Sequence, residues 1–158
     1  MSWDPESRVF DWGRGRVTLP EGFEYQRLRG IDTLIGRFVT RDGRITIGHD
    51  IGELSSEHGS GMGGREVVVK GFRVRTGSTM YKDEEGKTEW YFNLFFPDSG
   101  CAHFYLSSTD KADRVAMKAI EASFRPTASW WSGHRSAPSF QSCCGRTAGI
   151  GLRLPTGF

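Results

Sequence analysis

The side chains best suited to acid–base chemistry lie near the middle of the chain: His49, Asp50, Glu53, His58 and His103. None of their spacings matches a known catalytic motif, and the segment from His49 to Glu53 lacks the second histidine of a zinc-protease helix. A metal site would need three or four of these side chains to converge, and hydrogen-bonded or exposed histidines are the favoured alternative. We therefore expect no metal and no cofactor, and keep His49, Asp50 and His103 as candidate site residues.

Cys101 is the candidate nucleophile, because His103 follows two residues later and would share its strand face. Neighbours at this spacing stand roughly 6–7 Å apart, beyond the ~3 Å that proton transfer needs. A thiol packed in the core is the favoured alternative. Cys143 and Cys144 are adjacent, so the three cysteines predict no disulfide framework and do not define a redox compartment.

His49 belongs to the clearest structural pattern in the chain, a predicted β-hairpin over residues 30–52 with a two-residue turn at Asp42-Gly43. The predicted cross-strand pairs, which make one face nearly all apolar, are Thr40 with Ile45, Phe38 with Ile47, Gly36 with His49 and Leu34 with Ile51. Asp50 would point to the other face. The favoured hypothesis is that His49 is structural and fills the space beside Gly36, and the alternative is a ligand or proton-transfer group facing a pocket.

The remaining elements are predicted from alternation, turn residues and helical spacing. They are strands at 17–20 and 23–28, a strand at 67–76 with a β-bulge at Gly71, an apolar strand at 88–96, its return strand at 101–106, and a helix at 110–124. The return strand is predicted to set Cys101, His103 and Tyr105 beside Phe96, Leu94 and Phe92. The helix should bury a stripe formed by Ala112, Val115, Ala116, Ala119, Ile120 and Ser123. Residues 53–65 form a glycine-rich loop that lacks the Lys-Ser/Thr of a nucleotide site.

Together these elements predict an α+β domain over residues 13–126, an antiparallel β-sheet of about six or seven strands built from hairpins with the C-terminal α-helix packed on it. Residues 1–12 show no periodicity and are predicted to be an irregular N-terminal arm. From residue 127 the composition changes to serine, glycine, arginine and threonine, without any acid or lysine. We interpret 127–158 as a disordered or non-native tail.

The charge balance disfavours nucleic acid as a partner. The net charge is +2, but three arginines lie in the tail, which leaves 18 basic against 19 acidic residues in 1–126. The segment Gly13-Arg14-Gly15-Arg16 is too short for a basic patch. No apolar run reaches the ~20 residues of a membrane span. The N-terminus lacks the apolar core of a secretory signal, which favours a cytoplasmic protein, with export to the periplasm as the alternative if the N-terminus is truncated.

A family pattern is visible in Val17-x-Leu19-Pro20-x-Gly22-Phe23, the antiparallel middle and the helix ending Ile120-Glu-Ala-Ser-Phe124. The chain resembles the PsbP/Mog1-like domains, over roughly 16–126. The resemblance implies an α/β/α sandwich without a catalytic site that acts as an accessory or binding module on a larger protein. The segment from Gly43 to Gly52 looks more like uncharacterised bacterial relatives, and no binding residues carry over.

The leading hypothesis is therefore a non-catalytic binding module of a bacterial protein assembly, with a protein partner. One alternative is a small hydrolase or metal-binding protein that uses His49, His103 and Asp50. A second alternative is association of the tail with a membrane or nucleic acid.

Overall fold

The computed structural model describes residues 1–30, 33–52, 55, 64–82 and 84–127. The predicted glycine-rich loop at 53–65 lies mostly outside these residues, and so does the predicted tail apart from Thr127. Among the described residues, no helix is long and apolar enough to cross a membrane.

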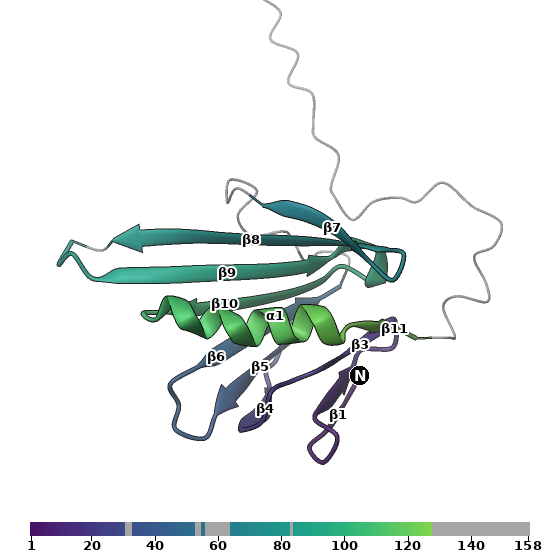
Figure 1. Cartoon of the computed structure of the whole chain (residues 1–158). Helices are drawn as coiled ribbons and strands as arrows, with labels where there is room; N and C mark the ends of the chain where they lie inside the picture. The colour runs from purple at the N-terminus through teal and green to yellow at the C-terminus, as the bar shows by residue number, and fades with distance from the viewer. Residues whose placement is uncertain (31–32, 53–54, 56–63, 83, 128–158) are drawn as a thin grey trace, which may run out of the picture.

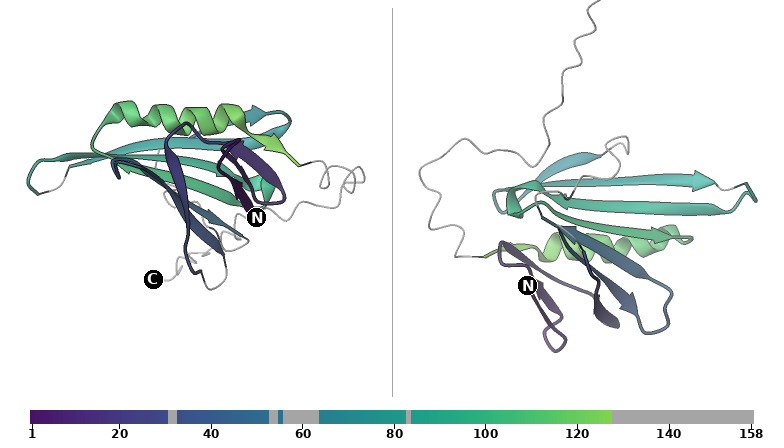
Figure 2. Two further views of the ribbon diagram at one scale, coloured as in Figure 1. Left: turned by 90° about the horizontal axis from the view of Figure 1, so that it is seen from below. Right: turned by 180° about the vertical axis from the view of Figure 1, so that it is seen from behind.

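The fold is built on one large antiparallel β-sheet of seven strands (Figure 1). In spatial order these are β4 (Phe23–Arg27), β5 (Leu34–Thr40), β6 (Thr46–Ile51), β10 (Ala102–Ser108), β9 (Thr88–Phe96), β8 (Phe72–Lys82) and β7 (Arg65–Val69). The helix α1 (Arg114–Ser123) lies along one face of this sheet, as the two views in Figure 2 show. The predicted mixture of an antiparallel sheet and a C-terminal helix is confirmed.

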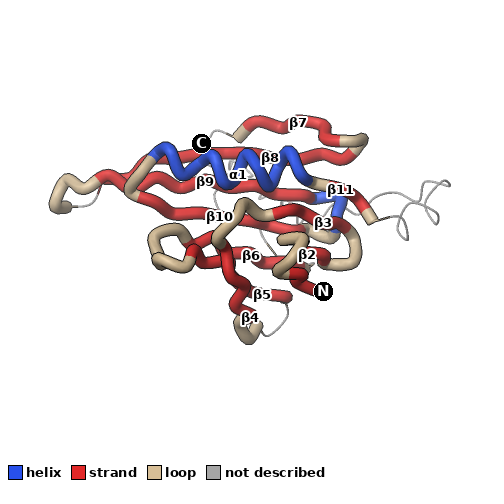
Figure 3. The backbone as a smooth tube through the Cα atoms, turned by 60° about the horizontal axis from the view of Figure 1, so that its bottom comes forward, coloured by secondary structure: helices blue, strands red, loops and turns tan. Residues whose placement is uncertain are grey.

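A second, smaller sheet packs on the same face as the helix (Figure 3). Its strands, in order, are β1 (Ser2–Asp4), β2 (Val9–Asp11), β3 (Gly15–Thr18) and β11 (Arg125–Pro126). The prediction that residues 1–12 form an irregular arm is wrong, because they supply two strands, and Phe10 and Trp12 are buried in the core. Three-residue strands are too short to show alternation in the sequence.

The register predicted for the β5–β6 hairpin is confirmed, with Gly36 opposite His49 and Leu34 opposite Ile51. The connection is wider than the predicted two-residue turn. Arg41 and Arg44 do not face each other across it, since Arg41 pairs with Glu24 and Arg44 reaches Asp113. Two arginines directly opposite each other would repel, and the wider connection avoids that cost.

The predicted β-bulge at Gly71 is a hairpin turn. Lys70 and Gly71 both have positive φ, at 52° and 83°, as a two-residue type I′ turn requires. The turn reverses the chain between β7 and β8, so Val67 pairs with Val74. The change of apolar phase across Gly71 is therefore a change of strand.

The predicted register of the β9–β10 hairpin is wrong by one residue. Phe104 pairs with Leu94, and His103 pairs with Phe95, on the other face. The connection is a short 3₁₀ helix, η1 (Pro97–Ser99), followed by Gly100 and Cys101 with φ of 78° and 53°. The extra residue of this connection moves every side chain of β10 to the face opposite the predicted one.

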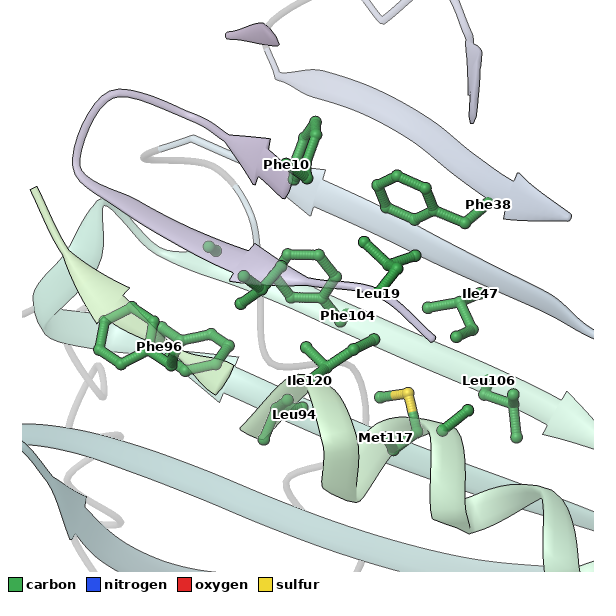
Figure 4. Close-up of a cluster of buried hydrophobic side chains, with 14 of the residues drawn as sticks. Phe10, Leu19, Phe38, Ile47, Leu94, Phe96, Phe104, Leu106, Met117 and Ile120 are labelled. Carbon is green, nitrogen blue, oxygen red and sulfur yellow. The ribbon is translucent and has the colours of Figure 1, made fainter. Parts of the chain in front are cut away.

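The helix is capped by a short 3₁₀ turn, η2 (Lys111–Asp113), in which the Asp110 carboxylate accepts a hydrogen bond from Ala112 N. The buried side of α1 consists of Ala116, Met117 and Ile120, whereas Val115, predicted to be buried, is 69% exposed. The main apolar core lies between the large sheet, the helix and the small sheet (Figure 4). It includes Phe10, Leu19, Phe38, Leu94, Phe104 and Ile120.

Candidate functional site

The structure separates His49, Asp50 and His103 onto the two faces of the large sheet, and the predicted acid–base residues Glu53 and His58 lie outside the described residues. His49 lies on the core face of β6, and Asp50, the next residue, lies on the outer face, opposite His103 of β10. The two predicted histidines therefore cannot act on one ligand from the same side of the sheet. Within the described residues, no group of three or more His, Cys, Asp or Glu side chains could hold a metal ion.

His49 is fully buried among aromatic rings. Its imidazole lies 4.7 Å from the ring of Phe10 and stacks on Tyr25 at 5.7 Å, with Tyr25 Oη 3.3 Å from Nε2. Gly36 makes room for it, because a Cβ at residue 36 would lie 2.4 Å from Nε2. Burial lowers the pKa of His49 to about 4, although the Leu34 backbone and the Asp50 carboxylate oppose the shift. A neutral imidazole walled in by rings fits the structural hypothesis for His49.

A cluster of polar side chains lies on the outer face of the large sheet. The Nε2 atom of His103 lies 2.9 Å from Oδ1 of Asn93, and its ring lies 5.3 Å from that of Tyr105. Burial raises the pKa of Tyr105, and the negative charge of Asp50 adds to the shift. Asn93 and Tyr105 escaped the sequence reasoning, because the register predicted for β10 placed Tyr105 beside Phe92.

Cys101 offers no nucleophile. It is fully buried, precedes β10 with φ of 53°, and is disulfide-bonded. The positive φ breaks the strand alternation on which the predicted pairing with His103 depended. A disulfide sulfur has no thiolate, so the candidate nucleophile is corrected. The favoured alternative, a thiol packed in the core, is confirmed in its burial and corrected in its oxidation state.

A concave site lies at one end of the large sheet, between that sheet and the turn that joins β2 to β3. We call it the arginine pocket: Arg14, Arg27 and Arg29 line it together with the apolar side chains of Trp12, Leu28, Leu34, Ile35 and Ile51. Gly30, Thr33, Gly52 and Gly100 complete the lining. Its volume is about 930 Å³, at the upper end of the range of small-molecule sites.

Buried hydrogen bonds fix the wall that carries Arg14. Trp12 Nε1 donates to the Ser99 carbonyl at 2.8 Å, and Ser99 Oγ donates to the Arg14 carbonyl at 2.7 Å. The stem of Arg14 lies against Gly100, where a Cβ would be 2.9 Å from Arg14 Cδ. The η1 segment thus holds the β2–β3 turn, and with it one arginine, at the mouth of the pocket.

The other two arginines come from the end of the edge strand β4. Arg27 pairs with Gly36 in the ladder, and Leu28 N donates to the Ile35 carbonyl at 3.1 Å just beyond it. This last ladder bond sets the backbone from which Arg29 projects. The charge of Arg27 also reaches Tyr25, whose pKa is raised by burial and lowered in part by this guanidinium.

The charges in this pocket are unbalanced. Among the described residues, the guanidinium groups of Arg14, Arg27 and Arg29 form no hydrogen bond or ion pair, and no acid lines the pocket. Elsewhere arginines face carboxylates, in the pairs Arg41–Glu24, Arg44–Asp113, Arg73–Asp98 and Arg75–Glu66. Sequence reasoning missed this pocket, and the only signal was a set of separate arginines with no shared spacing.

Comparisons with known proteins name no family. No family model and no curated protein match the chain. One solved structure, from Bacteroides thetaiotaomicron VPI-5482, is similar to it with a TM-score of 0.49 and 9% sequence identity. The similarity covers 72% of this chain and 45% of that one, so this chain spans less than half the length of that protein.

Proposed function

We propose that the chain is a non-catalytic accessory module of a bacterial protein assembly, and that it binds an anionic group of its partner in the arginine pocket. The observation that carries this proposal is that three arginines line the pocket and that, among the described residues, no acid lines it and no carboxylate pairs with them. Arginine presents a planar fork of donors that matches a carboxylate or phosphate, so an unpaired set is an anion-binding arrangement.

The energy available is sufficient for specific binding. A hydrogen bond to a charged group contributes ~1.5–3 kcal/mol, so two or three such contacts supply ~3–9 kcal/mol. Micromolar affinity corresponds to about 8 kcal/mol, so over most of this range apolar contacts must supply the remainder. The pocket offers such contacts, because Leu28 and Leu34 are about 40% exposed there. Of the acid–base candidates, His49, Asp50 and His103 do not line the pocket, which supports binding over catalysis: His49 is fully buried, and Asp50 and His103 are on the outer face.

The test is affinity capture from the native host with matched charge reversals. The variant Arg27→Glu/Arg29→Glu should lose the captured partner, while Arg16→Glu, which changes an exposed arginine of β3 outside the pocket, should keep it. Thermal melting of all three proteins controls for folding. If both variants retain the same partner, or if the protein turns over a substrate panel and captures nothing, the binding proposal is wrong.

The outer-face group supports a second proposal, a small hydrolase. Asp50 lies opposite His103 in the ladder and could orient it as a general base, with Tyr105 alongside. Hydrolysis of an ester or peptide panel that is lost in both Asp50→Asn and His103→Gln would establish it. Unchanged rates in both variants would exclude it.

Three expectations from the sequence stay predictions. They are the resemblance to the PsbP/Mog1-like domains, the cytoplasmic or exported location, and association of the tail with a membrane or nucleic acid, which depends on residues outside those described.

A further inference from the structure

We propose that the ligand of the arginine pocket is a carboxylate attached to an apolar chain. The inference rests on the proposed function in taking this pocket as the binding site, and it adds the chemical class of the group bound. The source of such a group is either a free fatty-acid-like molecule or the apolar C-terminal end of a polypeptide.

The head group follows from the charges. Arg14 lines the pocket from the β2–β3 turn, and Arg27 and Arg29 line it from the end of β4. A guanidinium group can present two parallel N–H donors to a carboxylate. Phosphate sites in proteins commonly use the N-terminus of a helix or a cradle of backbone amides. The described part of the pocket lining contains neither, since its backbone comes from strand ends and turns. Side-chain guanidinium groups are therefore the main hydrogen-bond donors in the described part of the pocket, and their planar geometry matches that of a carboxylate.

The apolar chain follows from the exposed leucines. Leu28 is 42% exposed and Leu34 is 39% exposed, and both line the pocket rather than the core. Trp12 and Ile51, 6% and 5% exposed, lie beside them. A small hydrated anion would leave these side chains in water. A hydrocarbon tail would cover them, and each methylene that it buries should raise the affinity about fourfold.

The direct test is calorimetric titration of the full chain with octanoate, acetate, octanol and inorganic phosphate. We expect octanoate to bind at least ~10-fold more tightly than acetate, because burial of two methylenes already accounts for about 16-fold. It should also bind at least ~10-fold more tightly than octanol, because one hydrogen bond to a charged group contributes ~1.5–3 kcal/mol. Phosphate should bind no better than acetate. If acetate or phosphate matches octanoate, the site recognises only a charge. If octanol matches octanoate, the cleft is merely apolar. Either result overturns the proposal.

Variants identify which contacts are responsible. Arg27→Gln and Arg29→Gln should each weaken octanoate binding ~10-fold, and Arg16→Gln should leave it unchanged. Leu28→Ser should weaken octanoate binding without changing the affinity for acetate. Octanoate binding that is unaffected by all the pocket variants would place the ligand elsewhere and contradict the inference.

The two sources are distinguished by a short peptide ending in Leu-Leu, with a free or an amidated C-terminus. Strong binding of the free form, lost on amidation, assigns the carboxylate to a polypeptide end, whereas binding of octanoate alone assigns it to a free fatty-acid-like molecule.

Failure of this inference can be told apart from failure of the proposed function. A captured partner that depends on Arg27 and Arg29, with no preference for octanoate over acetate, keeps the module and removes this ligand class. Octanoate binding without a captured partner does the reverse.

Discussion

Acidification should destabilise the protein through His49. The folded pKa of this residue is about 4 against an ordinary value of 6.5, because burial disfavours the charged imidazole. Between these two values the unfolded chain binds a proton that the folded chain does not, so stability falls as the pH decreases. The stabilisation is complete above about pH 6.5, and roughly 3 kcal/mol is lost by about pH 4. Below that value His49 is charged in both states and contributes no further change.

Urea unfolding followed by tryptophan fluorescence measures this loss. Wild type and His49→Gln are compared at about pH 7 and about pH 4.5, and the difference between the two proteins isolates His49 from other titrating groups. His49→Gln should be less stable at neutral pH because ring packing is lost, but it should lose about 2–3 kcal/mol less than wild type on acidification. An equal loss in both proteins would show that His49 is not held neutral, and would refute the reasoning.

Three further predictions concern packing and pairing. Gly36→Ala should lower the free energy of unfolding by about 1–3 kcal/mol, because the added Cβ would lie 2.4 Å from His49 Nε2. The loss should be smaller in a His49→Ala background. Denaturant melts that give an equal loss in both backgrounds would contradict this prediction. Val115→Asp should change the free energy of unfolding by less than ~0.5 kcal/mol, because Val115 is exposed, whereas Ala116→Asp should unfold the chain, because Ala116 is buried. Circular dichroism measures both, and the reverse result would show that α1 buries the face that contains Val115. Asp98→Asn should cost ~1–3 kcal/mol, since Asp98 accepts hydrogen bonds from the backbone and side chain of Arg73; the pKa of Asp98 is held low, so its contribution is lost only as the pH falls below about 4.

The elements that could be predicted are those whose signals are local. The β5–β6 register followed from alternating apolar residues on both sides of Asp42-Gly43, and it correctly placed Gly36 beside His49. The β9–β10 register could not be predicted from the sequence, because residues other than glycine rarely adopt a positive φ and Cys101 does so directly after Gly100. That one residue decided which face of the large sheet His103 occupies, and its side chain is buried there at 1% exposure.

The arginine pocket could not be predicted from spacing. Its charges come from the β2–β3 turn and the end of β4, and the segment near Gly100 braces Arg14. These segments meet only because the small sheet packs on the large one, through Phe10, Trp12 and the hydrogen bonds of Ser99. The two N-terminal strands β1 and β2, which make this packing, could not be predicted from alternation, because each is only three residues long.

The most direct test of the account is to observe the arginines themselves during ligand binding. The Nε–Hε resonances of the arginine side chains report on each guanidinium group, and they can be assigned with single Arg→Lys variants. Titration with octanoate should shift the resonances of Arg14, Arg27 and Arg29 and leave that of Arg16 in place. Shifts spread over the surface arginines, or no shift at any of the three, would contradict the assignment of this pocket as the binding site.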